Sequence, residues 1–301
     1  MSVGQTAPPR EDAGPRRTHG RRTHPRRTHP RRTHGRGSSR TMFSLVVHTV
    51  RLQRRGALIW GVVLGLYSAA IVATYPTFGD VEQMNQLMQA YPEGMREAFN
   101  LEDMGTPEGF LDSQVFSLAP LALAFFAILA CADAIAGAEE RGTIDVLLGN
   151  PLPRWQLVVG NLLATALSLL GIVAAVGLFT WGTAVLVDVD LPLRTTAEAV
   201  INLWPICLFF GGLALLCSAL FHRRALAVAI PGVVLFATYL VDVLGRVSDE
   251  LEDLRPASVF YYYGSAIKDG IDWGNFVGVT LVTSLFVLLA VLAFGRRDIY
   301  T

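Results

Sequence analysis

The residue types that usually carry out chemistry are sparse in this 301-residue sequence, and none stands in an evident catalytic or metal-binding motif. Outside residues 1–41 the only histidines are His48 and His222, which lie far apart in the sequence. The single lysine, Lys268, lies in Ala-Ile-Lys-Asp-Gly, whereas a phosphate-binding loop needs Gly-x-x-x-x-Gly-Lys followed by Ser or Thr. We therefore predict that the chain itself has no catalytic residue, no ATP hydrolysis and no metal site, and a membrane enzyme is the least favoured class.

Sulfur-containing side chains also indicate packing rather than reactivity. Three cysteines lie within apolar runs and lack the spacing of a disulfide or zinc framework, so each is expected to be a small buried hydrophobe. They are Cys131, Cys207 and Cys217. The stretch 76–113 contains four methionines, which can bind soft metals. No histidine or cysteine accompanies them, so we favour a helical lid over 80–99 that packs an apolar stripe on the rest of the protein. The methionines are Met84, Met88, Met95 and Met104.

Residues 1–41 form a basic tail that differs in composition from the rest of the chain. The tail carries 11 arginines and two acidic residues, whereas the remainder has 14 basic and 23 acidic residues. Residues 16–35 are four repeats, RRTHG, RRTHP, RRTHP and RRTHG, without one apolar residue, so we expect disorder. An arm that binds anionic lipid or nucleic acid is one interpretation. We favour a dispensable extension before a start at Met42, with no nucleic-acid partner.

The remaining sequence is too apolar for a soluble domain of ordinary composition. Charged residues make up 17% of the chain, against about 25% in typical soluble domains, and the mean hydropathy is +0.42. A bilayer core of about 30 Å needs about 20 helical residues. Six segments meet this length, which predicts an all-α integral membrane protein with six transmembrane helices within 42–301. The expected spans are 57–75, 114–136, 157–187, 197–221, 225–244 and 273–294.

Basic residues indicate how these spans are oriented. The segments on the side of residues 42–56 hold nine arginines in 45 residues, whereas those on the opposite side hold five basic residues in 75. Because basic loops favour the cytoplasmic side, we expect a multi-pass protein of the plasma membrane with both termini in the cytoplasm. Apolar side chains at helical spacing within 42–56 predict a short amphipathic helix on the inner leaflet. The alternative is that this segment is simply the start of the first span.

Small residues and isolated charges within the spans predict how the helices pack. Gly61 and Gly65 would form a small-xxx-small face in the first span, and Gly211 with Gly212 would form another in the fourth. Three carboxylates lie near the ends of spans, so we expect interfacial solvation rather than a proton relay at mid-membrane. These carboxylates belong to Asp133, Glu198 and Asp242.

Residues 137–156, GAEERGTIDVLLGNPLPRWQ, form the only sizeable loop on the expected cytoplasmic side. Gly142 allows a break after the second span, Thr143 can cap a helix, and 149–151 (Gly-Asn-Pro) would end that helix. The result would be a short helix with an exposed apolar face, which usually marks a contact with another protein. Packing of this helix on the inner leaflet is the alternative.

The run from Ala138 to Arg154, AEERGTIDVLLGNPLPR, resembles the hallmark of ABC-2 type transporter permeases. The family pattern is approximately Glu-Glu-x-x-Gly-Thr-Leu-(Glu/Asp)-x-Leu-Leu-x-x-Pro-(Val/Leu)-(Ser/Pro)-Arg. Two further stretches are similar to the family, TPEGF at 106–110 and FGRRDI at 294–299. The resemblance covers about residues 42–301. The sequence departs from the pattern at Asn161, where many members carry a basic residue, and at Pro153, where serine is common.

The resemblance implies a transmembrane permease subunit of an ATP-binding cassette transporter that works in efflux. Two such permeases, identical or different, would pair within the lipid bilayer. Separate nucleotide-binding ATPase subunits would bind ATP and magnesium and would push on the loop and on the amphipathic helix. The residues implied in this coupling are Glu139, Glu140, Arg141, Gly142, Thr143, Leu147, Leu148, Pro151 and Arg154.

Two other functions stay open on the sequence alone, a secondary transporter or channel and a membrane scaffold protein without transport. Copurification of an ATPase would favour the permease, and flux driven by an ion gradient without ATP would favour the secondary transporter. The apolar spans permit lipids, hydrophobic antibiotics or peptides as substrates and do not select among them.

Overall fold

The computed structural model describes residues 37–78, 90, 95–96, 104–142 and 153–296, and within them it contains helices and no strand. Among the described residues, six helical segments are long and apolar enough to cross a membrane. The predicted all-α fold with six transmembrane helices is therefore confirmed. The spans are Met42–Thr77, Pro107–Ala132, Arg154–Leu186, Leu193–Leu220, Arg224–Val247 and Trp273–Arg296.

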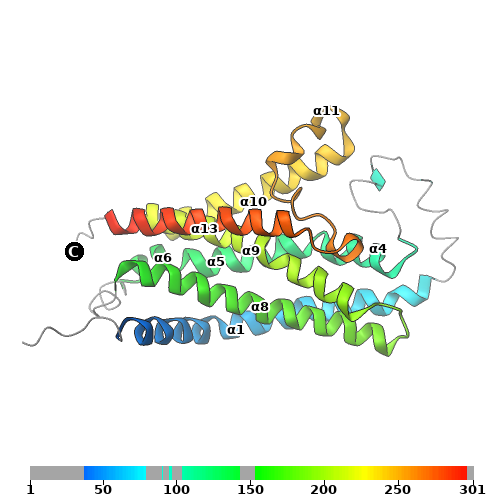
Figure 1. Ribbon diagram of the computed structural model, residues 1–301, viewed down its shortest axis with the longest axis horizontal. Helices are drawn as coiled ribbons and strands as arrows, with labels where there is room; N and C mark the ends of the chain where they lie inside the picture. Colours follow the sequence, from blue (N-terminus) through cyan, green and yellow to red (C-terminus); the bar gives the residue numbers. More distant parts are fainter. Residues whose placement is uncertain (1–36, 79–89, 91–94, 97–103, 143–152, 297–301) are drawn as a thin grey trace, which may run out of the picture. The chain divides into compact units, whose positions relative to one another are not determined.

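Two of the spans are composite and four are single helices (Figure 1). The first span combines α1 (Gly37–Thr74) and η1 (Tyr75–Phe78), and the second combines α4 (Pro107–Leu111), the π-helical turn η2 (Asp112–Phe116) and α5 (Ala119–Ala132). The single helices are α8 (Arg154–Leu186), α9 (Leu193–Leu220), α10 (Arg224–Val247) and α13 (Trp273–Arg296). The short helices are α6 (Ala136–Glu140), α11 (Asp249–Glu252), η3 (Arg255–Ala257) and α12 (Ala266–Asp269).

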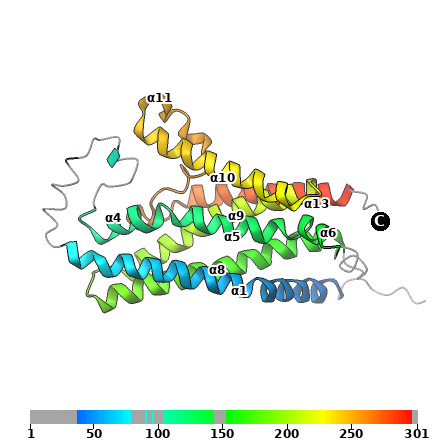
Figure 2. The ribbon, with the colours of Figure 1, turned by 180° about the vertical axis from the view of Figure 1, so that it is seen from behind.

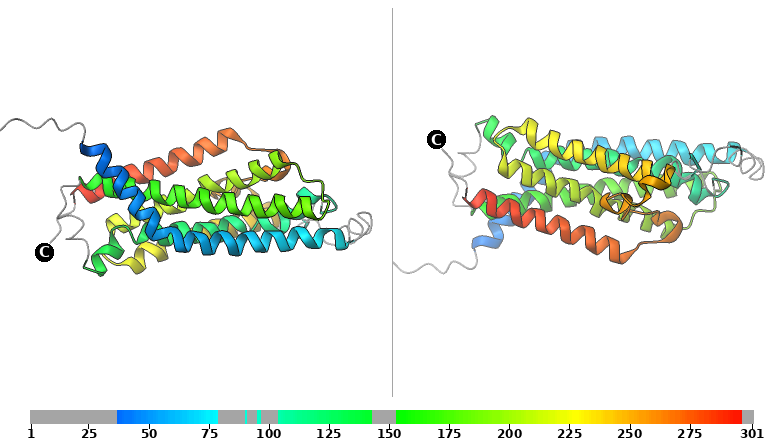
Figure 3. Two further views of the ribbon diagram at one scale, coloured as in Figure 1. Left: turned by 90° about the horizontal axis from the view of Figure 1, so that it is seen from below. Right: turned by 90° about the horizontal axis from the view of Figure 1, so that it is seen from above.

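The predicted amphipathic segment 42–56 is helical and continuous with the first span. Helix α1 begins at Gly37, so residues 37–41 belong to this helix rather than to the tail. Figure 3 (left) shows that the N-terminal part of α1 runs at an angle to the remainder. This part packs on α8 at Gly160, where a Cβ atom would lie 2.8 Å from the Leu45 Cδ2 atom. Its placement on the inner leaflet stays a prediction.

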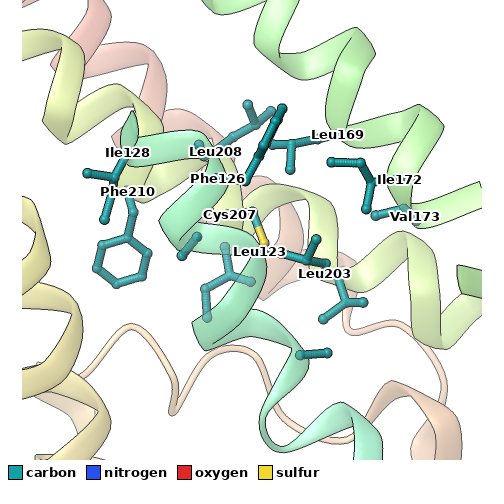
Figure 4. Close-up of a cluster of buried hydrophobic side chains, with 14 of the residues drawn as sticks. Leu123, Phe126, Ile128, Leu169, Ile172, Val173, Leu203, Cys207, Leu208 and Phe210 are labelled. Carbon is teal, nitrogen blue, oxygen red and sulfur yellow. The ribbon is translucent and has the colours of Figure 1, made fainter. Parts of the chain in front are cut away.

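Helix α9 is the central helix of the bundle. Of its most apolar 18-residue stretch, 72% is buried inside the protein, whereas the buried share of the corresponding stretch is 17% in α13 and 22% in the spans of α1 and α10. It packs against α5, α8, α10 and α13, and its buried side chains meet those of α5 and α8 in one apolar cluster (Figure 4). The outer faces of α1, α10 and α13 are therefore the surfaces that lipid or a partner must cover. The labelled cluster comprises Leu123, Phe126, Ile128, Leu169, Ile172, Val173, Leu203, Cys207, Leu208 and Phe210.

The predicted small-residue face of the first span is confirmed as a site of close helix packing, whereas the two glycines predicted to share a face in the fourth span contact different helices. A Cβ atom on Gly61 would lie 3.3 Å from the Ala175 Cβ atom, and one on Gly65 would lie 2.6 Å from the Phe179 ring, so both glycines face α8. On α9, the glycine at 211 faces α5 and the one at 212 faces α13. Because a glycine lets helices approach closely, these four positions set the spacing of the bundle.

The other packing predictions have mixed outcomes. All three cysteines are free and buried, as expected. Of the stretch 80–99, only Ala90, Met95 and Arg96 are described, so the predicted helical lid lies largely outside the described residues. Met95 is exposed, whereas Met104 is buried.

Candidate functional site: the connection between the second and third spans

The loop that the sequence singled out is described at both of its ends. Glu139, Glu140, Arg141 and Gly142 precede the undescribed part, and Arg154 follows it. Thr143, Leu147, Leu148 and Pro151 lie outside the described residues, and so does the predicted loop helix. The described part of the site consists of the two ends of the loop and of the helices that hold them.

The chain leaves the second span through a buried break in the helix. Helix α5 ends at Ala132 and α6 begins at Ala136, so backbone groups at the end of α5 and at the start of α6 lack partners within their own helices. The Ser218 hydroxyl of α9 satisfies them, because it accepts from the amides of Ala136 (2.9 Å) and Ile135 (3.3 Å) and donates to the Ala132 carbonyl (3.0 Å). One buried side chain thus fixes the break to the central helix. Nothing in the sequence pattern marked Ser218.

The carboxylate of Asp133 lies within this break and pairs with two arginines. The Arg224 Nε donates to Asp133 Oδ1, and Arg141 Nη1 lies 3.5 Å from the same oxygen. Gly137 makes room for this arrangement, since a Cβ atom there would lie 2.6 Å from Asp133 Oδ1. Asp133 is therefore a paired residue that joins the end of the second span to the start of α10.

Glu139 and Glu140 contact the turn between the fourth and fifth spans. Glu140 Oε1 accepts a 2.7 Å hydrogen bond from the backbone amide of Arg224, the first residue of α10. That amide is one of the unpaired donors of a helix N-terminus, where a carboxylate is also favoured by the helix dipole. The carboxylate of Glu139 lies 3.4 Å from the Nδ1 atom of His222. We refer to Asp133, Glu139, Glu140, Arg141, His222 and Arg224 as the charge cluster.

Gly142 ends the described part of the loop in a left-handed backbone conformation, with φ +64°. Residues with a Cβ atom adopt this region at a cost of about 1–2 kcal/mol, so glycine is the residue that turns the chain here without strain. No other atom lies within 4 Å of a Cβ atom built at this position, so the constraint comes from the backbone conformation and not from crowding.

Arg154 fixes the far end of the loop to the last span. Its Nη1 atom donates a 3.1 Å hydrogen bond to the carbonyl of Phe294, and its guanidinium lies 5.6 Å from the centre of the Phe294 ring. Phe294 is fully buried near the C-terminal end of α13, where helix carbonyls lack intrahelical partners and favour a cation. The loop and the C-terminal stretch 294–299 thus meet in the structure at Phe294, while the last residues, 297–301, are not described.

The third family-like stretch lies at the other end of the second span. The Thr106 hydroxyl accepts from the amide of Gly109 (3.1 Å), and Pro107 takes the first helical position, so TPEGF is the N-cap of α4. Figure 2 places α4 and α6 at opposite ends of this span. The stretch therefore starts the span and does not contribute to the charge cluster.

The expectation of interfacial solvation is wrong for Asp242. Its side chain is only 5% exposed and pairs with Arg246 (2.8 Å to Nη2) and with Arg255 (3.5 Å to Nε). Asp112, in the π-helical turn, is a buried carboxylate that the sequence did not single out. Glu198 pairs with Arg194 at 2.7 Å. In the part of the chain that the structure describes, no three histidine, cysteine or acidic residues are grouped as a metal site would require.

These features define the class of protein as a multi-pass helical membrane protein with an anchored loop between its second and third spans. Over residues 45–299 the sequence matches the family model described as ABC-2 family transporter protein. The match covers most of the chain, so the chain belongs to this family of ABC transporter permeases and is a membrane transport protein. The comparison with curated proteins found no match.

Proposed function

We propose that the chain is the permease subunit of an ABC exporter and that separate ATPase subunits drive it through the loop 139–154. The observation that supports the proposal best is that both described ends of this loop are tied to distant helices. The charge cluster ties its first end to α10, and Arg154 ties its last end to α13. A force applied to the loop would therefore move several spans together.

The chain's own residues would act as a mechanical linkage in this proposal. Leu147 and Leu148 would occupy a groove on the ATPase, and each would contribute about 1.5–3 kcal/mol if fully buried. Thr143 would cap the loop helix and Pro151 would end it. ATP and magnesium would be held by the ATPase subunits, and this chain would hydrolyse nothing.

A second permease, identical or different, would complete the transport path. The outer faces of α1, α10 and α13 expose large apolar side chains, which in a bilayer contact lipid or another permease. We propose export from the cytoplasm across the plasma membrane by alternating access between the two permeases.

Leu147→Asp is expected to uncouple ATP hydrolysis from transport while the protein still inserts. A carboxylate cannot be buried in an apolar groove without a large cost in free energy. The measurement is copurification of the partner ATPase with the permease. The rate of ATP hydrolysis by that ATPase is measured as well, with and without the permease. Leu254→Asp, at a leucine that is 53% exposed and lies outside the loop, is the matched control. If Leu147→Asp copurifies as the unchanged protein does, the loop is only a connector at the membrane surface.

Two positions, one on each proposed side of the membrane, provide a test of the proposed orientation. A cysteine at Arg296, beside the proposed cytoplasmic terminus, should react with a membrane-impermeant maleimide only after the cells are permeabilised. A cysteine at Glu252, in the proposed outer segment, should react in intact cells. Both positions are exposed and the three native cysteines are buried, so the background should be low. The reverse pattern would invert the topology.

A further inference from the structure

A cavity of about 730 Å³ lies between α1, α5 and α8 at the end of the bundle that carries the charge cluster. Ligand pockets usually measure about 300–1,000 Å³, and a water molecule takes up only about 30 Å³. Along α1 the lining runs from position 45 to position 60, which corresponds to about 22 Å of helix rise. The cavity also reaches the surface, because the lining residue Leu52 is 71% exposed. It therefore has the size and the length for an extended molecule and an opening through which that molecule can enter.

The charged side chains at this cavity are already paired with one another. Counting His48 as neutral, the charged lining residues are Asp133 and Arg141, and their charges cancel. Arg141 contacts both the carboxylate and the backbone carbonyl oxygen of Asp133, and Arg224 binds the same carboxylate from outside the lining. With three carboxylates and two guanidinium groups, the whole charge cluster has one negative charge in excess when its histidine is neutral. The lining therefore favours neither an anionic nor a cationic ligand.

Two uncharged polar groups of the lining have hydrogen-bonding capacity to spare. The amide nitrogen of Asn161 donates to the Ala130 carbonyl (3.4 Å), whereas its Oδ1 atom accepts no hydrogen bond from the described part of the chain. The Thr49 hydroxyl makes no hydrogen bond to any described residue. Neither oxygen is enclosed by protein, so both are open to a molecule in the cavity. They offer an acceptor and a group that both donates and accepts.

These two groups lie at the same level of the helix pair formed by α1 and α8. Gly160 packs on Leu45, where a Cβ atom at the glycine would lie 2.8 Å from the leucine Cδ2 atom. Farther along, Gln53 donates to the Thr165 hydroxyl at 3.1 Å. Position 49 lies between these two contacts on α1, and position 161 lies between them on α8. One polar head can therefore reach both oxygens.

The other walls of the cavity are largely apolar. At Gly56 the Phe126 ring comes within 3.6 Å of a Cβ position on α1, so the glycine leaves room beside the ring. An apolar channel with a few uncharged polar groups at one level is complementary to an amphiphile with an uncharged head. The large apolar side chains of the lining are Leu45, Leu52, Trp60, Phe126, Leu129 and Leu157.

We propose that this cavity binds one uncharged amphiphile, a single acyl or alkyl chain that carries a hydroxyl-bearing head such as glycerol. The chain would lie along Phe126, and the head would exchange hydrogen bonds with Thr49 and Asn161. Gln53 takes no part, because its amide already donates to Thr165 and accepts from Ser168 (2.9 Å). The site goes beyond the proposed ATPase coupling and does not depend on it.

Photolabelling of the full chain in phosphatidylcholine nanodiscs tests the proposal. Three diazirine probes would share one alkyl chain and differ only in the head, which is a glycerol ester, a sulfate or a trimethylammonium group. Labelled peptides are identified by mass spectrometry, and saturable labelling is defined by competition with the same amphiphile without the diazirine. We expect peptides that contain Gly56 or Phe126 to be saturated at a several-fold lower fraction of the glycerol ester than of either charged probe. Equal saturation by the three probes, or labelling that does not saturate, would overturn the proposal.

Two variants separate this site from general contact between α1 and the bilayer. Thr49→Val keeps the size of the side chain and should weaken binding of the glycerol ester about two- to tenfold, the effect of one hydrogen bond. Ser44→Ala removes an exposed hydroxyl of the same helix outside the cavity and should leave labelling unchanged. Gly56→Leu should fill the space beside Phe126 and lower saturable labelling by the glycerol ester without changing a charge. Unchanged labelling in both Thr49→Val and Gly56→Leu would contradict the site.

A resident lipid and a transported molecule can share this chemistry, and transfer across the bilayer distinguishes them. In vesicles with the partner ATPase and ATP, faster transfer of the glycerol ester by the unchanged protein than by Gly56→Leu would identify a transported molecule. Equal transfer would identify a resident lipid, and the site stands in either case. Photolabelling needs no ATPase, so a failure of this site and a failure of the proposed coupling are distinguishable.

Discussion

Replacing Arg224 by glutamate is expected to release the end of the second span from the turn between the fourth and fifth spans. Arg224 binds the Asp133 carboxylate through its side chain and the Glu140 carboxylate through its backbone amide. Glutamate at this position would place three carboxylates together and repel both partners. Amide hydrogen exchange of peptides that cover 133–142 should become several-fold faster. ATPase coupling should fall in the same variant.

Two controls separate this effect from a general loss of charge. Arg223→Glu changes the neighbouring exposed arginine, which is not a member of the charge cluster, and should leave exchange over 133–142 unchanged. In an Asp133→Asn background, Arg224→Glu should accelerate amide exchange over 133–142 less than it does in the unchanged protein, because the two residues interact directly. If the effects of Asp133→Asn and Arg224→Glu on exchange were additive, the Asp133–Arg224 pair would not hold the loop. Equal effects of Arg223→Glu and Arg224→Glu would show the same.

Gly212→Leu is expected to prevent α9 and α13 from packing and to lower the thermal stability sharply. A Cβ atom at this position would lie 3.1 Å from the Thr283 Cγ2 atom and 3.4 Å from the Thr283 carbonyl oxygen, and backbone cannot move aside as a side chain can. Overpacking usually costs about 1–3 kcal/mol, and a leucine in this space lies at the upper end of that range or beyond it. The measurement is the unfolding midpoint in detergent, followed by size-exclusion chromatography.

Gly278→Leu on α13 is the matched control, because no other atom lies within 4 Å of a Cβ atom at that position. Leucine has a higher helix propensity than glycine, so this variant should be neutral or slightly more stable. Equal midpoints for the two variants would mean that α9 and α13 are not in close contact at Gly212.

The number of spans and the small-residue contacts could be predicted because they depend on local sequence. A run of about 20 apolar residues is itself the requirement for crossing a bilayer. The small-xxx-small spacing of Gly61 and Gly65 can likewise be read within one helix. The composite second span could not be predicted in this way. Its break after Ala132 is stable only because Ser218, 86 residues later, supplies the missing hydrogen bonds.

The candidate site was predicted as a loop, but its supports were not. The pattern from Glu139 to Arg154 is contiguous, so the sequence shows it directly. The partners of that loop come from other helices, as in the pairing of Glu140 with the amide of Arg224 and of Arg154 with Phe294. Asp242 illustrates the same limit, because its partner Arg255 follows a turn that no periodicity reveals. Pairings across helices depend on tertiary packing and leave no periodic signal in one sequence.

The bond between Arg154 and Phe294 sets an order of events during biosynthesis. The ribosome delivers the chain from its N-terminus, and Phe294 emerges 140 residues after Arg154. Until then the start of α8 has inserted without the carbonyl that its arginine binds in the finished protein. A nascent chain that stalls before the last helix would therefore expose an incomplete docking surface. The proposed coupling therefore predicts that an ATPase engages only a permease whose last helix has been made.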